Sequence, residues 1–200
     1  MSVKAGLYLI YRHALEFARG MLSEDRFEHS VSTARYGFEL GNQYGVDPER
    51  AFLAGILHDV AREFSSGYLL LQARKEGIIP RKEEKICPFL LHGKVAASIV
   101  EKEIGIKDKG VLDAIASHVT GRRQWAKLEQ VVYLADKVEP TRDYPKADTV
   151  RRLLEKGEFD CALLESLRNA IIYAAQTRGR IVDTETVVVF NEIAKAQARY

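Results

Sequence analysis

The chain has 200 residues, of which 46% are hydrophobic and 29% are charged, and its formal net charge is +2. That size and balance are typical of one globular domain with a sizeable core, and the small net charge argues against a dedicated nucleic-acid or membrane-surface binder. The two cysteines, Cys87 and Cys161, follow no metal or redox spacing, so we expect both to be reduced and buried in a cytoplasmic protein.

In chain order, the first feature is an apolar run at residues 5–11, which is too short to cross a membrane and lacks the pattern of a signal peptide. Helix patterns follow to the end of the chain. Ser23 is the expected N-cap of the second helix, which ends at Gly45, and Asp47 and Pro48 begin the third. The expected helices cover residues 4–20, 23–44, 47–63, 68–77, 88–105, 108–118, 128–138, 146–156 and 158–176.

The last patterned stretch, residues 186–198, is ambiguous, because its β-branched start is typical of a strand and its remainder is typical of a helix. We expect a helix, since no partner strand is visible elsewhere. The chain also lacks repeats, low-complexity tracts and linkers. The prediction is a single all-α domain over residues 1–200, a helical bundle with a motif core at about 20–145 and a helical C-terminal part at 146–200.

Six polar residues stand in apolar surroundings on successive predicted helices, at intervals close to one helix plus its connection. The six are His29, His58, Asp59, His92, His118 and Asp136. A single histidine of this kind is more often a hydrogen-bonded core residue than a ligand, and a single aspartate is often a cap or an ion-pair partner. Inward polar residues on each core helix are, however, what a metal site inside a bundle requires. The set therefore predicts a metal site between the core helices. His13 is expected to lie on the surface, outside this site.

The order of these residues resembles the HD superfamily of metal-dependent phosphohydrolases. The segments RFEHS, AGILHDVAR, FLLHG, AIASHVTG and YLADKVEPTRDYP together resemble the YqeK-type HD hydrolases, and the resemblance covers roughly residues 20–190. Its most specific element is ADK-x-EP-x-R. Val119 stands where relatives often have threonine, and Arg62 stands where they often have lysine. The resemblance implies an HD-domain fold and symmetrical cleavage of diadenosine tetraphosphate into two molecules of ADP.

The resemblance also implies which residues bind metal. One ion would be held by His29, His58, Asp59 and Asp136. Two roles stay open for His92 and His118, which would either bind a second ion bridged by Asp59 or contact the substrate phosphates. Imidazole and carboxylate ligands suit iron, manganese, zinc or cobalt better than magnesium. The resemblance implies iron, as one ion or two.

A metal ion of this kind lowers the pKa of water and polarises a phosphoryl oxygen, so we expect Asp59, His92 and His118 to act in catalysis and in substrate binding. Arginine forms paired hydrogen bonds with phosphate. The candidate arginines are Arg26, one helical turn before His29, Arg62, Arg142, in a loop beyond Pro140, and Arg178 or Arg180 in the polar stretch 177–183. Each arginine has a plain alternative as a solvated surface residue, and residues 177–183 have one as a simple connection.

Small residues follow two of the histidines: Gly93 comes after His92, and Thr120 and Gly121 come shortly after His118. Small residues let other atoms approach the backbone closely. We therefore expect a phosphate chain to pass near these two positions.

Hydrolysis of dinucleoside polyphosphates is the favoured function, with two alternatives. One alternative is a phosphohydrolase of mononucleotides or cyclic dinucleotides, which shares the metal chemistry. The other is a catalytically inactive nucleotide-binding regulator, against which the intact ligand set argues. The expected partner is a small-molecule nucleotide, with no nucleic acid and no membrane, and the resemblance makes a homodimer plausible.

Overall fold

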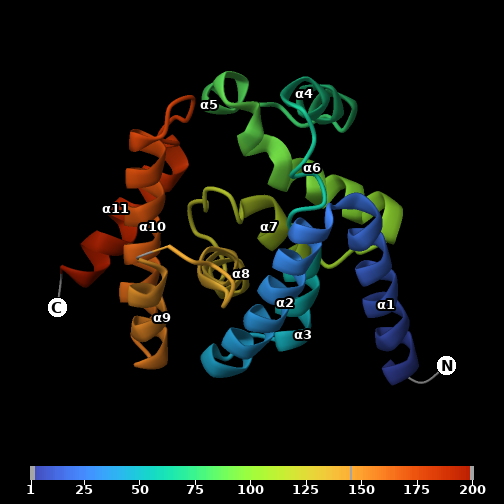
Figure 1. The fold of residues 1–200 in the computed structure, drawn as a ribbon, viewed down its shortest axis with the longest axis horizontal. Helices are drawn as coiled ribbons and strands as arrows, with labels where there is room; N and C mark the ends of the chain where they lie inside the picture. The colour runs from blue at the N-terminus through green and yellow to red at the C-terminus, as the bar shows by residue number, and fades with distance from the viewer. Residues whose placement is uncertain (1–2, 145, 199–200) are drawn as a thin grey trace.

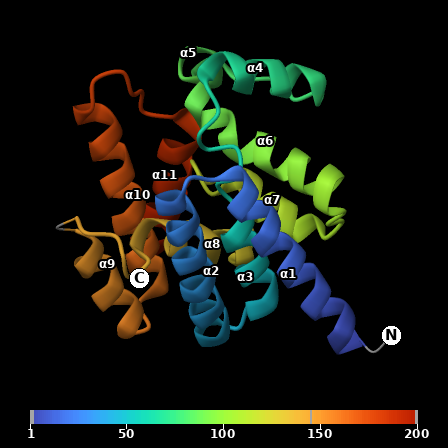
Figure 2. The same cartoon turned by 45° about the vertical axis from the view of Figure 1, so that its right-hand side comes forward.

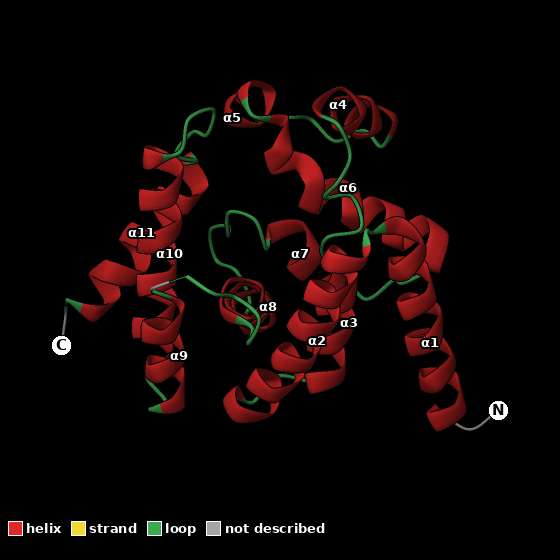
Figure 3. Ribbon diagram, in the orientation of Figure 1, coloured by secondary structure: helices red, strands yellow, loops and turns green. Residues whose placement is uncertain are grey.

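The computed structural model describes residues 3–144 and 146–198, and every regular element in those ranges is a helix (Figures 1 and 3). This confirms the predicted all-α fold. The α-helices are α1 (Val3–Met21), α2 (Glu24–Tyr44), α3 (Pro48–Leu57), α4 (Ser66–Lys75), α5 (Lys82–Ile86), α6 (His92–Ile99), α7 (Lys109–Ser117), α8 (Lys127–Val138), α9 (Ala147–Glu155), α10 (Phe159–Gln176) and α11 (Thr184–Gln197). A 3₁₀ turn, Pro88–Leu91, precedes α6, and a π turn, Val100–Ile104, follows it. None of the described helices is both long and apolar enough to cross a membrane.

Helix α8 forms the centre of the molecule. In Figure 1 it is seen almost end-on, with α2, α3 and α7 on one side and α9, α10 and α11 on the other. It contacts α2, α3 and α7 as well as α9 and α10, and its side chains are buried on nearly every face. A helix that is apolar all round is expected in such a place. Asp136, near the end of α8, therefore projects into the interior.

Two glycines let the helices that carry the histidines pack closely. A Cβ atom on Gly55 of α3 would lie 2.7 Å from the Cα atom of Ala34 on α2. A Cβ atom on Gly93 of α6 would lie 2.9 Å from the carbonyl oxygen of Ala116 on α7. Neither distance is compatible with a side chain, so glycine permits both approaches. The close packing brings the end of α3 near α2 and the start of α6 near the end of α7.

Helices α9, α10 and α11 form a C-terminal layer, which Figure 2 shows beside α2 and α8. Buried apolar side chains of α10, including Leu163 and Leu167, belong to the same core as those of α8. An ion-pair contact fastens the far end of this layer, because both terminal nitrogens of Arg81, just before α5, donate to the carboxylate of Asp183, just before α11, at 3.2 and 2.8 Å. This contact links the segment before α5 to the segment before α11.

The C-terminal helix confirms the preferred interpretation of residues 186–198. Asp183 caps α11, since its carboxylate accepts hydrogen bonds from the backbone N–H groups of Glu185 and Thr186. Asp47 caps α3 in the same way, and Asp108 caps α7. Ser23 occupies the N-cap position of α2, but its hydroxyl makes no capping hydrogen bond; its N–H donates instead to the carboxylate of Glu63 at 2.7 Å.

Two predicted helices differ from the structure in length or continuity. The helix expected over residues 47–63 ends at Leu57 and continues as turns, in which backbone N–H groups bond to carbonyls three residues earlier, as Arg62 does to Asp59. The helix expected over residues 88–105 is a 3₁₀ turn, α6 and a π turn in succession. Apolar residues such as Val60 remain buried in the turns, so the hydrophobic pattern did not reveal the change of backbone.

One smaller expectation was wrong, and one short helix was missed. Cys87 is buried as expected, whereas Cys161 is exposed, because it lies on the outer face of α10. The short helix α5 was not predicted, since its sequence is mostly charged and its buried residue Glu84 is held by ion pairs with Arg81 and Lys94. His13 is exposed on α1, as expected.

Candidate metal centre and nucleotide pocket

Three of the site histidines lie where a helical segment ends. His58 follows α3, His92 follows the 3₁₀ turn and His118 follows α7. In each case the Nδ1 atom is 2.7 Å from the carbonyl oxygen three residues earlier. A carbonyl oxygen has two lone pairs and only accepts hydrogen bonds, so Nδ1 carries the proton in each of the three rings. Each ring therefore presents its Nε2 lone pair to the interior, as a metal ligand requires.

His29 is oriented differently, because it lies in the middle of α2, where the backbone carbonyls are already paired. Its Nδ1 atom is 3.0 Å from a carboxylate oxygen of Glu139, and its Nε2 atom is 3.1 Å from Oδ1 of Asp136. Glu139 is fully buried and also accepts hydrogen bonds from the Ser32 hydroxyl and from Thr141. Glu139 thus acts on His29 as the helix-end carbonyls act on the other three histidines.

Glu139 is ionised despite its burial. Burial raises the pKa of a carboxyl group, but hydrogen bonds from His29, Ser32 and Thr141 outweigh this effect and lower the pKa of Glu139 to about 2. A permanently charged acceptor makes His29 a more basic ligand than a neutral carbonyl would.

Asp59 divides its two carboxylate oxygens between two groups of histidines. Its Oδ1 atom is 3.2 Å from Nε2 of His92 and 3.6 Å from Nε2 of His118. Its Oδ2 atom is 3.5 Å from Nε2 of His58 and 3.9 Å from Nε2 of His29. A carboxylate in this position is able to bridge two cations that lie on opposite sides of it.

The remaining carboxylate, Asp136, faces the same group as Asp59 Oδ2. Its Oδ1 atom is 3.5 Å from Nε2 of His58, in addition to its contact with His29. Lys137 donates to its Oδ2 atom at 2.7 Å. The structure therefore brings all six predicted polar residues of the sequence together, from α2, α8 and the ends of three other helical segments.

The surroundings of the His58 ring show, independently of the family resemblance, that these residues fit a metal ion. The Nε2 atom of His58 is buried and makes no hydrogen bond within the described part of the chain, although two carboxylate oxygens lie 3.5 Å from it. Ligand atoms of one ion lie roughly 3 to 3.5 Å apart, because each is about 2.0–2.2 Å from the metal. Three sets of three ligand atoms have mutual distances within 4.8 Å: His29–His58–Asp59, His58–His118–Asp136 and Asp59–His92–His118.

The electrostatics of the cluster also favour a cation. Burial lowers the pKa of His58, but Asp59 and Asp136 more than compensate and raise it to about 10. Burial raises the pKa of both aspartates, yet neighbouring His58, with Lys137 beside Asp136, holds both carboxyl groups well below their usual range. Positive charge is thus strongly favoured at this point, and a divalent ion supplies it without a proton.

His118 shows the opposite tendency. Burial lowers its pKa to about 4, and the neighbouring rings of His58 and His92 contribute in the same direction. A histidine that stays neutral keeps its lone pair available, so His118 is suited to act as a ligand. Its Nε2 atom lies 3.0 Å from Nε2 of His92.

Two of the predicted arginines contact the cluster directly. Nη1 of Arg26 is 3.4 Å from Oδ2 of Asp59. Arg142 donates from Nη2 to Oδ1 of Asp136 at 2.9 Å and to Nε2 of His29 at 3.1 Å. The loop after α8 therefore folds over the site, as its position beyond Pro140 predicted.

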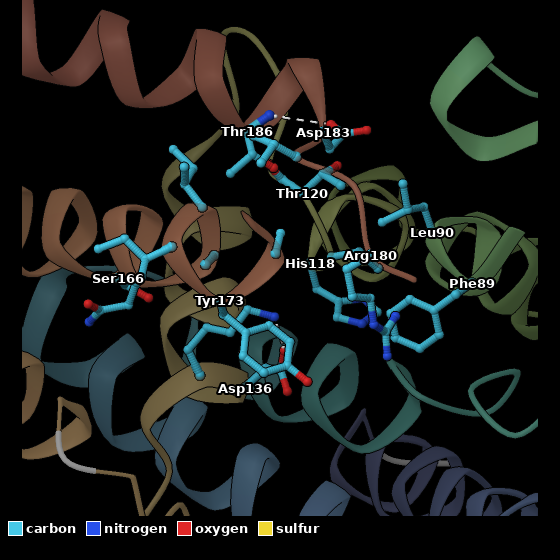
Figure 4. A pocket seen from close by; sticks show the side chains of 18 of the residues that line it. Phe89, Leu90, His118, Thr120, Asp136, Ser166, Tyr173, Arg180, Asp183 and Thr186 are labelled. Carbon is cyan, nitrogen blue, oxygen red and sulfur yellow. Dashed lines mark hydrogen bonds and ion pairs between the residues drawn. The ribbon is translucent and has the colours of Figure 1, made fainter. Parts of the chain in front are cut away.

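Two other arginines, Arg62 and Arg180, pack against the ring of Phe89. The guanidinium carbons of Arg62 and Arg180 each lie 4.0 Å from the centre of the Phe89 ring, within the range of a cation–π contact. Figure 4 shows Arg180 beside Phe89 at one side of the cavity. The connection at 177–183 thus contributes Arg180 to the cavity, and Arg178 is not among the residues that line it.

The cluster opens into a cavity of about 690 Å³ between the segments that carry the cluster residues and the C-terminal layer. Asp59, His92, His118 and Asp136 lie in its wall together with the four arginines. Cavities of roughly 300–1,000 Å³ hold ligands of the size of a nucleotide. Figure 4 shows residues of α10, such as Ser166 and Tyr173, in the same cavity as His118 and Asp136.

Three residues of this site were not assigned a role from the sequence. Lys137 and Glu139 lie inside the motif ADK-x-EP-x-R. Their closeness to Asp136 in the sequence was the only indication that they belong to the site. Neither contact of Glu139, with His29 or with Ser32, is visible in a sequence, because more than a hundred residues separate the partners. Phe89 looked like an ordinary core residue.

The structure shows what surrounds the two glycines that follow the histidines. Gly93 faces backbone carbonyls of α7, so it serves helix packing. Gly121 has a φ of +70°, and the Trp125 ring covers the position of its missing Cβ atom at 2.9 Å. Protein atoms therefore fill the space on the Cβ side of both glycines, whereas Thr120 lines the cavity. The passage of a phosphate chain near Thr120 stays a prediction.

The comparisons with known proteins agree with this geometry. The HD domain family matches residues 26–141. The symmetrical bis(5'-nucleosyl)-tetraphosphatase of Bacillus subtilis is 33% identical over 89% of this chain and 94% of that protein. The protein of the same name from Halalkalibacterium halodurans is 31% identical over 92% of this chain and 97% of that protein.

A solved structure is similar over the same extent. It is a crystal structure from Clostridium acetobutylicum, described as a predicted HD superfamily hydrolase involved in NAD metabolism, and it is 30% identical to this chain. The TM-score is 0.87, and the match covers 93% of this chain and 97% of that one. The chain therefore belongs to the HD domain family, within the group whose curated members are named symmetrical bis(5'-nucleosyl)-tetraphosphatase.

Proposed function

We propose that this protein is a metal-dependent hydrolase that cleaves diadenosine tetraphosphate symmetrically into two molecules of ADP. The observation that carries the proposal is a buried cluster of four histidines and two aspartates, part of which forms the wall of a nucleotide-sized, arginine-lined cavity. Relatives of nearly full length bear the name of this activity. The whole of residues 1–200 acts as one HD-type hydrolase domain, in which the motif core at about 20–145 supplies the metal ligands and residues 146–200 complete the cavity.

One metal ion would be held by His29, His58, Asp59 and Asp136. His58 supports this assignment with its unpartnered Nε2 atom, and Asp136 with its position between His29 and His58. His92 and His118 would hold a second ion, with Asp59 as the bridge, since Asp59 turns one oxygen toward each group. The histidine-rich donor set fits a transition metal, and we propose iron, with manganese, cobalt or zinc as functional substitutes.

A transition metal at this position lowers the pKa of water and polarises a phosphoryl oxygen. The protein's own residues bind and orient the substrate. Arg26 and Arg142, on two sides of Asp59 and Asp136, would hold the phosphates nearest the cluster. Arg62 and Arg180, stacked on Phe89, would hold the phosphates farther along the chain.

Asp59, His92 and His118 are the groups placed closest to the reacting phosphorus in this assignment. Backbone carbonyls position His92 and His118 through Nδ1, so their Nε2 lone pairs would stay directed at the second ion. Arginine side chains then stabilise the ADP that departs, because the charge on its terminal phosphate increases as the bond breaks.

Product analysis tests the proposal. Purified protein is incubated with diadenosine tetraphosphate and Fe²⁺ or Mn²⁺, and the products are separated by chromatography. We expect ADP alone, with hydrolysis abolished by a chelator and restored by metal. AMP and ATP in equal amounts would show asymmetric cleavage and contradict the proposal, as would full activity in metal-free protein.

The same assay distinguishes the alternatives. Rapid turnover of a mononucleotide or a cyclic dinucleotide, with diadenosine tetraphosphate left intact, would favour the second enzymatic function. Nucleotide binding without turnover of any substrate would favour the regulator. NAD belongs in the substrate panel, because the Clostridium acetobutylicum structure carries NAD metabolism in its description.

The proposal also covers the identity of the metal, the cellular compartment of the enzyme and its oligomeric state. Mass spectrometry of protein purified without oxygen is expected to find iron. We place the enzyme in the cytoplasm, where nucleotide substrates are produced, and fractionation of cells tests that placement. A homodimer is the proposed assembly, and the molar mass in solution, measured by light scattering, decides it.

A further inference from the structure

The inner face of α10 carries a polar side chain whose hydrogen-bonding groups are unused. Both amide atoms of Asn169, Nδ2 and Oδ1, are buried and have no hydrogen-bond partner within the described residues. The hydroxyl groups of Ser166, one turn earlier, and of Tyr133 on α8 are buried as well, but these two side chains face each other. Leaving a buried polar group unpaired is unfavourable. The position of Asn169 is therefore not explained by the stability of the fold.

Asn169 and Ser166 line the same cavity as the metal cluster. The two ends of that cavity differ in charge. Near the cluster the wall contains Arg26, Arg62 and Arg142, whereas every residue that α10 contributes to the wall is uncharged. In Figure 4, Ser166 lies on the opposite side of the cavity from Phe89 and Arg180. A ligand with an anionic end and an uncharged polar end matches this division.

A nucleoside diphosphate is such a ligand. With its phosphates at the arginines, its base would reach the α10 end. Adenine presents an amino group beside a ring nitrogen that accepts a hydrogen bond, and the amide of asparagine is complementary to this pair. The apolar residues Ala170 and Ile172 in the same wall suit the face of an aromatic base.

We propose that Asn169 is the specificity-determining residue of a base-binding subsite on α10, and that its amide, which is buried in this structure, turns toward a bound nucleotide and hydrogen-bonds the edge of adenine. The inference rests on the proposed function in its choice of adenine, and it adds the residue that reads the base. Ser166 lies beside Asn169 and supports the amide when the base is bound. An ordered water that satisfies Asn169 permanently is the competing explanation, and it predicts no dependence on the base.

Binding of two products to metal-loaded protein tests the subsite. ADP occupies both ends of the cavity, whereas inorganic diphosphate occupies the phosphate end alone. In Asn169→Leu we expect the dissociation constant for ADP to rise roughly ten- to a hundredfold, the range of a lost bidentate base contact, with that for diphosphate unchanged. Equal weakening of ADP and diphosphate, or no weakening of ADP, would overturn the proposal.

A second variant tests the direction of the hydrogen bonds and does not depend on the fit of leucine. In Asn169→Asp the carboxylate only accepts, so it opposes the ring nitrogen of adenine and favours guanine, which offers two adjacent donors at N1 and N2. We expect the preference to shift from ADP toward GDP by roughly tenfold or more. Asn191→Asp, an exposed position on α11, is the matched control and should leave the ratio unchanged.

An unchanged ADP-to-GDP ratio in Asn169→Asp would overturn the proposal, and so would an equal change in the Asn191→Asp control. Calorimetry measures these affinities whether or not the protein hydrolyses diadenosine tetraphosphate. If that substrate stays intact while Asn169 still determines the preference for ADP over GDP, the proposed function fails and the base subsite stands. If the substrate is cleaved and Asn169 has no effect, the reverse holds.

Discussion

The two ends of the cavity differ in whether their polar side chains are hydrogen-bonded to the protein. At the metal end, the Nδ1 atoms of His58, His92 and His118 are bonded to carbonyl oxygens at 2.7 Å, and His29 is bonded to Glu139. Orientation is therefore complete before any ligand arrives. At the α10 end, the amide of Asn169 has no such partner among the described residues.

The difference teaches how each end is suited to its ligand. A metal ion needs donors at fixed distances and angles, so its ligands are held by a second layer of hydrogen bonds. A nucleobase brings its own donors and acceptors, and the protein groups that meet it are paired only in the complex. Substitutions at the metal end should therefore affect turnover and metal content, whereas substitutions on α10 should affect the choice of nucleotide.

The largest effect is expected at Asp59, which touches both groups of histidines. Asp59→Ala should lower kcat by roughly a thousandfold or more, since a metal supplies several kcal/mol of transition-state stabilisation and each 1.36 kcal/mol corresponds to about tenfold in rate. Steady-state kinetics and metal analysis measure the two consequences. Asp148→Ala, at an exposed carboxylate on α9, controls for the loss of one negative charge, and a fully active Asp59→Ala enzyme would contradict the assignment.

The second prediction separates the two groups that Asp59 joins. His118→Ala should reduce turnover roughly a hundred- to a thousandfold and leave one metal ion per chain, because His29, His58 and Asp136 are intact. His29→Ala should lose that ion as well. Mass spectrometry of the metal content compares the variants, and His92→Ala is expected to behave like His118→Ala. If His118→Ala empties the site as completely as His29→Ala, the six residues form one indivisible cluster.

The smallest effect is expected where the metal end is supported without a direct ligand. Glu139→Gln keeps the shape of the side chain and its acceptor for His29 but removes the negative charge. Such a change in the layer behind the ligands typically costs about 10- to 100-fold in metal affinity or activity. Titration of metal into the stripped protein measures the loss, with Glu155→Gln, an exposed residue of α9, as the control.

Glu139 also predicts an acid dependence in the metal-free protein. Its pKa is lowered from the usual 4.5 to about 2 in the fold, since hydrogen bonds outweigh the effect of burial. Its contribution to the free energy of unfolding is therefore complete above about pH 4.5 and is lost as the pH falls toward 2. Glu139→Gln should differ most from the wild type above pH 4.5, and a difference that grows on acidification would contradict the hydrogen bonding described.

Much of the fold was predictable because local signals determine it. Asp47 and Asp108 begin helices through hydrogen bonds within three residues, and the sequence predicted a helix start at both. Asp183 caps α11 in the same way but was not predicted as a cap. The end of α3 was not predictable, since Val60 and Ala61 remain buried in the turns that follow it. The hydrophobic pattern reports burial there, and it does not report whether the backbone bonds run over three residues or four.

The candidate site divides in the same way. The histidines and aspartates were recognisable as costly polar groups in apolar stretches, one helix after another. Glu139 was not, because a glutamate before a proline at a helix end is ordinary on a protein surface, and its burial results from contacts with α2. Asn169 follows an arginine in an amphipathic helix, and only the cavity distinguishes it from a surface residue.

The placement of three histidines at the ends of helical segments has a consequence for how the chain tolerates insertions and deletions. Each residue added to a helix turns everything beyond it by about 100°, since a turn contains 3.6 residues. One residue inserted between Asp47 and His58, or between Asp108 and His118, would rotate the imidazole out of the cluster even though every ligand is still present. A change of length in the connection between α4 and α5 would not have this effect. The geometry of the metal centre therefore depends on the number of residues in α3 and α7.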